Sequence, residues 1–242
     1  MQKILRYWKT ALGYVLVVCL CLGLTTFGSR TVSVMIENSP MEDRTLIAID
    51  AGHGGIDGGA QSCTGVAESQ INLEIALRLN DLLTFLGYET FLLRTEDTSL
   101  HTDGTTIAAQ KVSDLKNRVR IVADTKPDLL ISIHQNTFTD ERYSGAQVFY
   151  ANTEESSQLA RMLQQNLVQI ANPGSNRKPK QAKGIYLMER IVCSGVLVEC
   201  GFLTNYQEEA KLRTAEYQKE ICGVLAATIS SWGQKKEAAT TP

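Results

Sequence analysis

The sequence predicts a single α/β domain with a mostly parallel, twisted sheet and helices on both faces. Short apolar runs typical of strands alternate with amphipathic segments of ten or more residues typical of helices. Two runs, Leu129–His134 and Val196–Glu199, are almost continuously apolar, as in strands that are buried on both faces. Strands joined by helical crossovers pair in parallel. Without its N-terminal segment, the 242-residue chain has about the length of one ordinary domain.

The N-terminal segment differs from the rest of the chain. Three basic residues precede Ala11–Phe27, which carries no charged side chain. This pattern predicts a signal or membrane-anchor segment over residues 1–29, and the positive-inside rule places the following domain outside the cytoplasm. We favour an uncleaved anchor, because no Ala-x-Ala cleavage site follows the apolar run. Residues 30–44 are predicted to be a polar linker.

The first half of the domain alternates strand and helix. Apolar residues at helical spacing predict a helix from about Ser69 to Leu86, which Gly87 ends, and a second at Ala108–Thr125, which Pro127 ends. Residues 95–106 and 135–144 are predicted to be polar loops. The predicted strands of this half are Leu46–Asp50, Tyr88–Arg94, Leu129–His134 and Ala146–Tyr150.

The second half continues the alternation with shorter elements. A helix is predicted at Ser156–Ile170, followed by a basic loop over residues 171–183 and a short strand at Gly184–Met188. The predicted strand Val196–Glu199 and helices Glu208–Leu212 and Tyr217–Trp232 complete the domain, over residues 45–233. Residues 234–242 are predicted to be a flexible tail.

Charge and cysteine content exclude two classes of protein. The net charge of −2 and a pI of about 6.0 argue against nucleic-acid binding, which usually needs a basic surface. The cysteines outside the N-terminal segment show no Cys-x-x-Cys spacing, which argues against a zinc ribbon. An exported domain permits disulfides, but we expect most of these cysteines to be small buried thiols. They are Cys63, Cys193, Cys200 and Cys222.

Two histidines occupy the same kind of position. His53 follows the first strand, inside a stretch with five glycines between positions 52 and 59, and His134 ends a later strand. The carboxyl ends of parallel strands lie along one edge of the sheet, where ligands bind in open α/β folds. Two imidazoles and one carboxylate, with a position left open for water, form the usual set of a catalytic zinc site. His101, in a polar loop, is predicted to be an ordinary exposed histidine.

The carboxylate of this set is open between two residues. Glu68 stands at the end of the glycine-rich loop, just before a predicted helix, and Asp57 lies within the loop. An acidic residue at a helix N-terminus also has a plain structural role, because it complements the helix dipole. Spacing alone excludes neither residue.

Glu199 is a carboxylate at the end of an apolar strand. Ionised groups are rarely buried without a partner, so an acid here requires either a cation or a chemical role. Near a metal-bound water it could act as general base and then as general acid. The alternative is a structural salt bridge, for example with Arg94 or Lys183.

Taken together, these motifs resemble the zinc-dependent N-acetylmuramoyl-L-alanine amidases of bacterial cell walls. The resemblance extends from Leu46 to Trp232 and is specific because several modest motifs occur in the right order. The motifs are Asp50–Ala60, Glu68 with the helix start at Ile71, Leu93–Thr95 with Asp97, Leu115–Arg118, Ser132–Asn136, Ser144–Ala146 and Val198–Asn205.

The resemblance implies an α/β catalytic domain and a role for each site residue. His53, Glu68 and His134 would bind Zn²⁺, and Glu199 would be the catalytic acid/base. The resemblance favours Glu68 over Asp57 as the third ligand. Asn136 would contact a metal ligand or the substrate. The implied reaction cleaves the amide bond between the lactyl group of N-acetylmuramic acid and L-alanine in peptidoglycan.

Within this family the chain is most similar to the germination-specific, spore-cortex branch. The similarity rests on Gln135, on the run Tyr143–Tyr150, on the single N-terminal apolar segment and on the lack of added wall-binding repeats in this sequence. It implies a step towards muramic δ-lactam in the cortex and leaves room for an accessory protein in the spore envelope. The alternatives are another extracytoplasmic zinc peptidase or deacetylase, and a non-catalytic wall-binding module.

Overall fold

The computed structural model of the chain describes residues 44–240, without the side chains of residues 236–240. The predicted anchor and nearly all of the predicted linker therefore lie outside the described residues. Within the described part, no helix combines the length and the apolar character that a membrane span requires.

The domain is built on a six-stranded sheet in the order β2-β1-β3-β6-β4-β5. Neighbouring strands are parallel, except that β4 runs antiparallel to β6. The prediction of a mostly parallel sheet is therefore confirmed. The strands are β1 (Leu46–Ala51), β2 (Glu89–Leu92), β3 (Leu129–Asn136), β4 (Gln147–Tyr150), β5 (Lys180–Gln181) and β6 (Ser194–Phe202).

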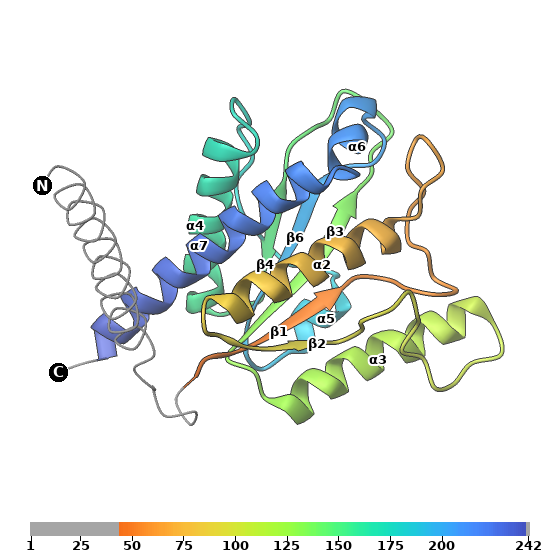
Figure 1. Ribbon diagram of the computed structural model, residues 1–242. Helices are drawn as coiled ribbons and strands as arrows, with labels where there is room; N and C mark the ends of the chain where they lie inside the picture. Colours follow the sequence, from red (N-terminus) through yellow and green to blue (C-terminus); the bar gives the residue numbers. More distant parts are fainter. Residues whose placement is uncertain (1–43, 241–242) are drawn as a thin grey trace, which may run out of the picture. The chain divides into compact units, whose positions relative to one another are not determined.

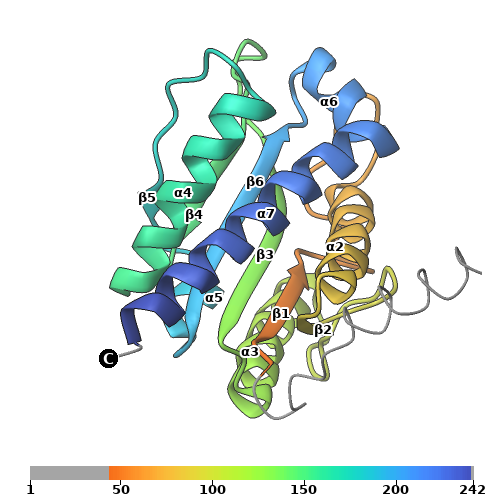
Figure 2. The same cartoon turned by 60° about the vertical axis from the view of Figure 1, so that its left-hand side comes forward.

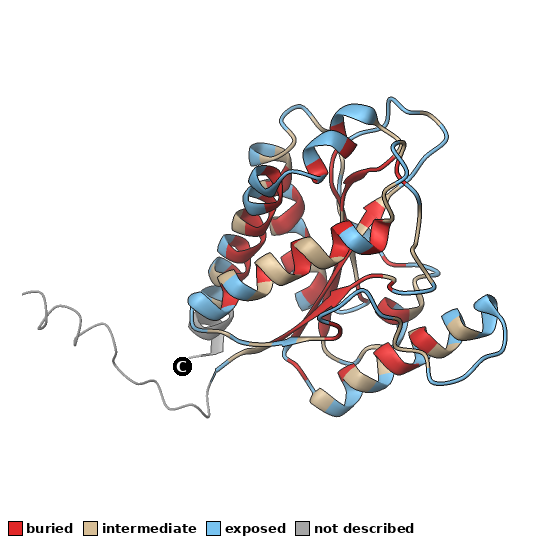
Figure 3. Cartoon of the chain, turned by 45° about the vertical axis from the view of Figure 1, so that its right-hand side comes forward, coloured by how far each residue is buried: buried red, intermediate tan, exposed pale blue. Residues whose placement is uncertain are grey.

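Helices cover both faces of the sheet, as predicted (Figures 1 and 2). One face carries α2 (Glu68–Phe85), α4 (Glu154–Ile170) and α7 (Ala215–Thr240), and the other carries α3 (Ile107–Thr125) and α5 (Tyr186–Arg190). The short helix α6 (Tyr206–Leu212) follows β6. The strands and the inner sides of the helices are buried, and the loops are exposed (Figure 3).

Each face of the sheet has its own apolar core, because side chains alternate along a strand. In β3, Ile131 and Ile133 pack on the α2/α4/α7 face, whereas Leu130 packs on the α3/α5 face. In β6, Val198 and Leu197 divide between the faces in the same way. This alternation places the even-numbered residues of β3 and the odd-numbered residues of β6 on the α3/α5 face.

Two predicted elements are wrong. Residues 184–188 were expected to form a strand, but Tyr186–Arg190 is helix α5, and the short strand β5 lies earlier, at Lys180–Gln181. Leu187 and Met188 are adjacent and both buried, which a strand with one covered face does not allow, and Leu, Met, Glu and Arg are strong helix formers. Helix α7 also continues to Thr240 instead of ending at Trp232.

The free edge of β4 is capped by the side chain of Gln164. Strand β5 pairs with only the last two residues of β4, so the first part of the edge has no neighbouring strand. Gln164, from α4, accepts a hydrogen bond from the Val148 N–H (2.8 Å) and donates one to the Ala146 carbonyl (3.0 Å). This buried amide therefore satisfies two main-chain groups that would otherwise be unpaired.

We expect Gln164→Leu to lower the free energy of unfolding by about 2–4 kcal/mol, because it leaves two buried main-chain groups without partners. The neighbouring Gln165 is exposed, so Gln165→Leu is the matched control and should change stability by less than about 0.5 kcal/mol. Urea unfolding of the three proteins measures the difference. Equal stability of the two variants would show that Gln164 does not secure this edge.

Candidate active site

The loop after β1 turns sharply at His53. Its backbone φ angle is 61°, in the left-handed region that a residue with a side chain seldom adopts. Two buried arginines hold the carbonyl groups around this turn. Arg94 donates to the carbonyls of Ala51 (2.8 Å) and Gly52 (3.0 Å), and Arg118 donates to those of Ala51 (3.0 Å) and His53 (2.7 Å). The position of the His53 ring thus depends on two charged side chains beneath it.

Buried carboxylates neutralise Arg118. Its guanidinium pairs with Asp50, on β1, and with Asp114, one turn earlier on α3 (2.6 Å). Burial alone would raise the pKa of Asp50, but the Arg118 charge and the Ser132 hydroxyl together hold that pKa below its usual range. Asp50 is therefore ionised at neutral pH, and the buried charges are paired.

His53, Glu68 and His134 come together at the carboxyl edge of the sheet. One possible ligand atom from each lies within 4.8 Å of the other two, and no other group of this kind was found among the described residues. Glu68 accepts from His134 Nδ1 (3.0 Å), and its second oxygen lies 3.3 Å from His53 Nε2. The structure thus brings together the three residues that the resemblance implied as ligands.

The electrostatics of this group keep its carboxylate ionised. Burial would raise the pKa of Glu68, but the hydrogen bonds from His134 and His53 hold it far below its usual range. For His53, burial lowers the pKa, but the contacts with Glu68 and Asp57 outweigh that effect and raise it to about 9. A carboxylate that remains ionised and faces two ring nitrogens has the chemistry of a His₂Glu metal site.

Asp57 does not belong to this group of ligand atoms. It accepts from the other ring nitrogen of His53, Nδ1 (2.9 Å), and pairs with Lys111 (2.7 Å). Metal-binding histidines usually have such a carboxylate partner, which fixes the tautomer and the ring orientation. Of the two carboxylates that the sequence left open, Glu68 faces the other ligand atoms and Asp57 lies on the opposite side of the His53 ring.

Glu199 lies beside His134, because the two are register partners in β6 and β3. One of its carboxylate oxygens is buried without a hydrogen-bond partner, and burial raises its pKa to about 7. The alternative of a salt bridge is wrong for the described residues: Arg94 binds main-chain carbonyls, and Lys183 forms no ion pair. An unpaired buried carboxyl group needs an explanation, and here it faces the histidines.

The other residues considered from the sequence lie outside the group of possible metal ligands. Asn136 follows His134 by two residues, past an irregularity in the β3–β6 register, and its carbonyl accepts from Leu203 (2.8 Å). Its contact with substrate stays a prediction. His101 is half-buried rather than exposed and bonds Ser99 (2.9 Å). The four cysteines of the described residues are free. Cys200 and Cys222 are buried, whereas Cys63 and Cys193 are only half-buried, so the expectation that most would be buried holds for two of the four.

Several residues support the site in ways that the sequence did not predict. Asn72 donates to the Gly52 carbonyl (3.1 Å) and to Glu68 (3.2 Å), and Gln135 donates its main-chain N–H to Glu68 (3.1 Å). Arg118 occurs in the motif Leu115–Arg118, but neither that motif nor its helix face, lined by Leu115, Val119 and Val122, indicated what Arg118 contacts. Its pairing with Asp50, 68 residues away, has no local signature.

The family model for N-acetylmuramoyl-L-alanine amidases matches residues 47–231, nearly all of the described domain. The chain belongs to this family. The family and its characterised relatives are enzymes that cleave this amide of peptidoglycan, so the predicted amidase activity is confirmed at that level. The match also removes the support for the two alternatives, another zinc hydrolase and a non-catalytic wall-binding module.

Individual relatives agree with the family match. The germination-specific N-acetylmuramoyl-L-alanine amidase of Bacillus subtilis is 34% identical over 193 residues, which cover 79% of this chain and 81% of that protein. The amidase AmiA of Escherichia coli is 27% identical over 78% of this chain and 76% of its own. Among solved structures, the CwlD amidase of Clostridioides difficile, in complex with the GerS lipoprotein, superposes with a TM-score of 0.76 at 34% identity, covering 79% of this chain and 99% of that one.

Gly52 leaves room for the His134 ring. A Cβ atom at position 52 would lie 2.2 Å from His134 Nε2, and the imidazole would have to move. We expect Gly52→Ala to keep the fold but to weaken Zn²⁺ binding about tenfold or more, as loss of ligand orientation does. Competition with a chromogenic chelator measures the affinity.

Gly58→Ala is the matched control for this prediction. It lies in the same loop, and its Cβ would meet only Ala67, at an ordinary 3.5 Å. This variant should bind Zn²⁺ as the wild type does. Equal affinity of all three proteins would show that the His134 ring is not needed for metal binding.

Proposed function

We propose that the chain is a zinc-dependent amidase in which His53, Glu68 and His134 bind the metal and Glu199 carries the proton. The observation that supports this most directly is the convergence of three ligand atoms within 4.8 Å beside a buried carboxyl oxygen that has no partner. Zinc bound there would supply a Lewis acid that polarises the lactyl carbonyl and activates water.

The donor set fits this metal. Two imidazoles and one carboxylate are a known catalytic zinc set, and Asp57 supplies the second hydrogen bond that orients His53. Oxygen-only sites for Mg²⁺ or Ca²⁺ have a different composition. The buried Arg94 and Arg118 hold the main-chain carbonyls around His53 and so orient the loop that would supply this ligand.

Glu199 is positioned to transfer the proton of the reaction. As the carboxylate it would accept a proton from the attacking water, and as the acid it would return that proton to the amide nitrogen as the C–N bond breaks. L-Alanine then leaves as a neutral amine at the head of the stem peptide. The unpaired oxygen of Glu199 is free for both steps, because no protein group competes for it.

We expect Glu199→Gln to lower the rate of stem-peptide release about 10²–10⁴-fold while Zn²⁺ affinity stays unchanged, since the amide cannot accept or return the proton. His134→Ala should lose both activity and zinc. Mass spectrometry of peptides freed from purified peptidoglycan measures the rate, with the exposed Glu216→Gln as control. Normal turnover by Glu199→Gln would refute its role as the proton carrier.

We further propose that the enzyme acts outside the cytoplasm, on the peptide side chains of spore cortex, as a step towards muramic δ-lactam. The support is its similarity to the germination-specific amidase of B. subtilis. That the CwlD amidase was solved in complex with the GerS lipoprotein supports a further proposal, that an accessory protein binds this chain too.

Complementation tests the cortex role. In B. subtilis lacking its germination-specific amidase, we expect this chain to restore muramic δ-lactam in the cortex and the Glu199→Gln variant not to restore it. Chromatography and mass spectrometry of cortex fragments provide the measurement. Cortex without δ-lactam, in spores whose extracts contain the active amidase, would argue against this role.

A further inference from the structure

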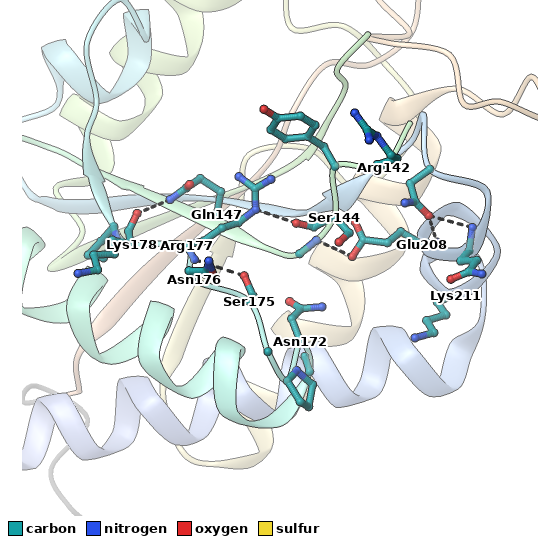
Figure 4. Close-up of a pocket in the computed structure, with 18 of the residues that line it drawn as sticks. Arg142, Ser144, Gln147, Asn172, Ser175, Asn176, Arg177, Lys178, Glu208 and Lys211 are labelled. Carbon is teal, nitrogen blue, oxygen red and sulfur yellow. Dashed lines mark hydrogen bonds between the residues drawn. The ribbon is translucent and has the colours of Figure 1, made fainter. Parts of the chain in front are cut away.

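A second feature of the domain is a wide, basic cavity that the metal site does not use. Its volume is about 920 Å³, and it lies between the β3–β4 loop, the α4–β5 loop and the start of α6 (Figure 4). The α4–β5 loop belongs to the basic loop predicted over residues 171–183, to which the sequence assigned no role. Five basic side chains line the cavity: Arg142, Arg177, Lys178, Lys180 and Lys211.

The positive charge of this cavity is only partly neutralised. Arg142 pairs with Asp140 (2.7 Å), but the other four basic residues form no ion pair with any described residue. The single acidic residue of the lining, Glu208, points its oxygens at the main-chain N–H groups of Gly145 (2.7 Å) and Phe202 (2.9 Å). The cavity therefore has the charge of an anion site.

Arg177 is held in place at the centre of this lining, between Gln147 and Ser144 (Figure 4). Its Nε donates to the Ser144 carbonyl (2.8 Å), and its guanidinium lies 4.6 Å from the centre of the Phe202 ring and 5.9 Å from that of Tyr143. The two terminal nitrogens form no hydrogen bond with the described residues. A planar fork that is fixed at one end and free at the other is suited to bidentate binding of a carboxylate.

One residue of the cavity lining lies on the strand beside Glu199. Gln147, part of its lining, is the register partner of Glu199 across β4 and β6, and His134 is the partner on the other side. Paired residues of neighbouring strands point to the same face, so the three side chains form one row across the sheet. With strands about 4.8 Å apart, the cavity starts about one strand spacing from the proposed proton carrier.

The charge of the cavity indicates which part of the substrate it would receive. In peptidoglycan the glycan carries no charge near the cleaved bond, because the lactyl carboxyl group forms the amide. The stem peptide, in contrast, carries free carboxylates beyond L-alanine. A carboxylate two residues along an extended peptide lies about 7 Å from the scissile nitrogen. A cavity whose lining starts at Gln147, one strand along from Glu199, is therefore within reach of such a carboxylate.

We propose that this cavity binds a stem-peptide carboxylate on the leaving side of the scissile amide, with Arg177 as its principal ligand. The proposal rests on the proposed amidase function, and it assigns substrate recognition to the α4–β5 loop. Lys178, Lys180 and Lys211 add longer-range attraction for the same peptide.

The test compares two forms of peptidoglycan, one native and one with its stem carboxylates converted to carboxamides. For the full-length, zinc-loaded wild type, initial rates of peptide release should be about tenfold or more higher on the native form, since a charged hydrogen-bonded pair contributes about 1.5–3 kcal/mol. Arg177→Gln should lose this preference by slowing on the native form only. Its unchanged rate on the amidated form would demonstrate intact folding and chemistry.

Arg120→Gln is the charge-matched control, because Arg120 is exposed on α3 and does not line the cavity. It should keep the wild-type preference. A preference retained by Arg177→Gln, or an equal fall on both substrates, would overturn the carboxylate site while leaving the amidase function intact. A wild type that releases no peptide from either form would instead refute the proposed function.

Discussion

The site depends on the main-chain carbonyls after β1 and the two buried arginines that bind them. A left-handed backbone at His53 costs about 1–3 kcal/mol and persists only where the surroundings enforce it. Arg94 and Arg118 enforce it through charged hydrogen bonds, and Arg118 can be buried only because Asp50 and Asp114 neutralise it. Removing one member of such a buried pair typically costs about 3–5 kcal/mol, so fold stability and site geometry rest on the same contacts.

The register of the sheet is the second determinant. His134, Glu199 and Gln147 form one row because β3, β6 and β4 pair at those residues. A slip of one residue would turn Glu199 to the opposite face, among the apolar side chains under α2 and α7. The alternation of large apolar residues in β3 and β6 prevents that slip, so core packing determines which carboxylate faces the histidines.

Sequence reasoning recovered the features that have local signatures. Continuous apolar runs marked β3 and β6, and their last residues, His134 and Glu199, fell at one edge because parallel strands end together. Glu68 and Asp57 could not be separated, because the path of a loop with five glycines cannot be derived from its spacing. The role of Arg118 was missed because its partner is distant in sequence, and α5 was misread because five residues give too little periodicity.

The architecture separates chemistry from recognition. The proposed metal ligands and Glu199 stand on strand ends and on a loop held by buried charges, where even one added methyl group at Gly52 would collide with a ring. The basic cavity is formed largely by two surface loops, and their contacts with that framework include the Phe202 ring beside Arg177 and the bond from Gln147 to the Lys178 carbonyl. Substitutions in these loops can therefore alter which peptides are held without moving the metal ligands. In this arrangement substrate preference can diverge between relatives that share one reaction.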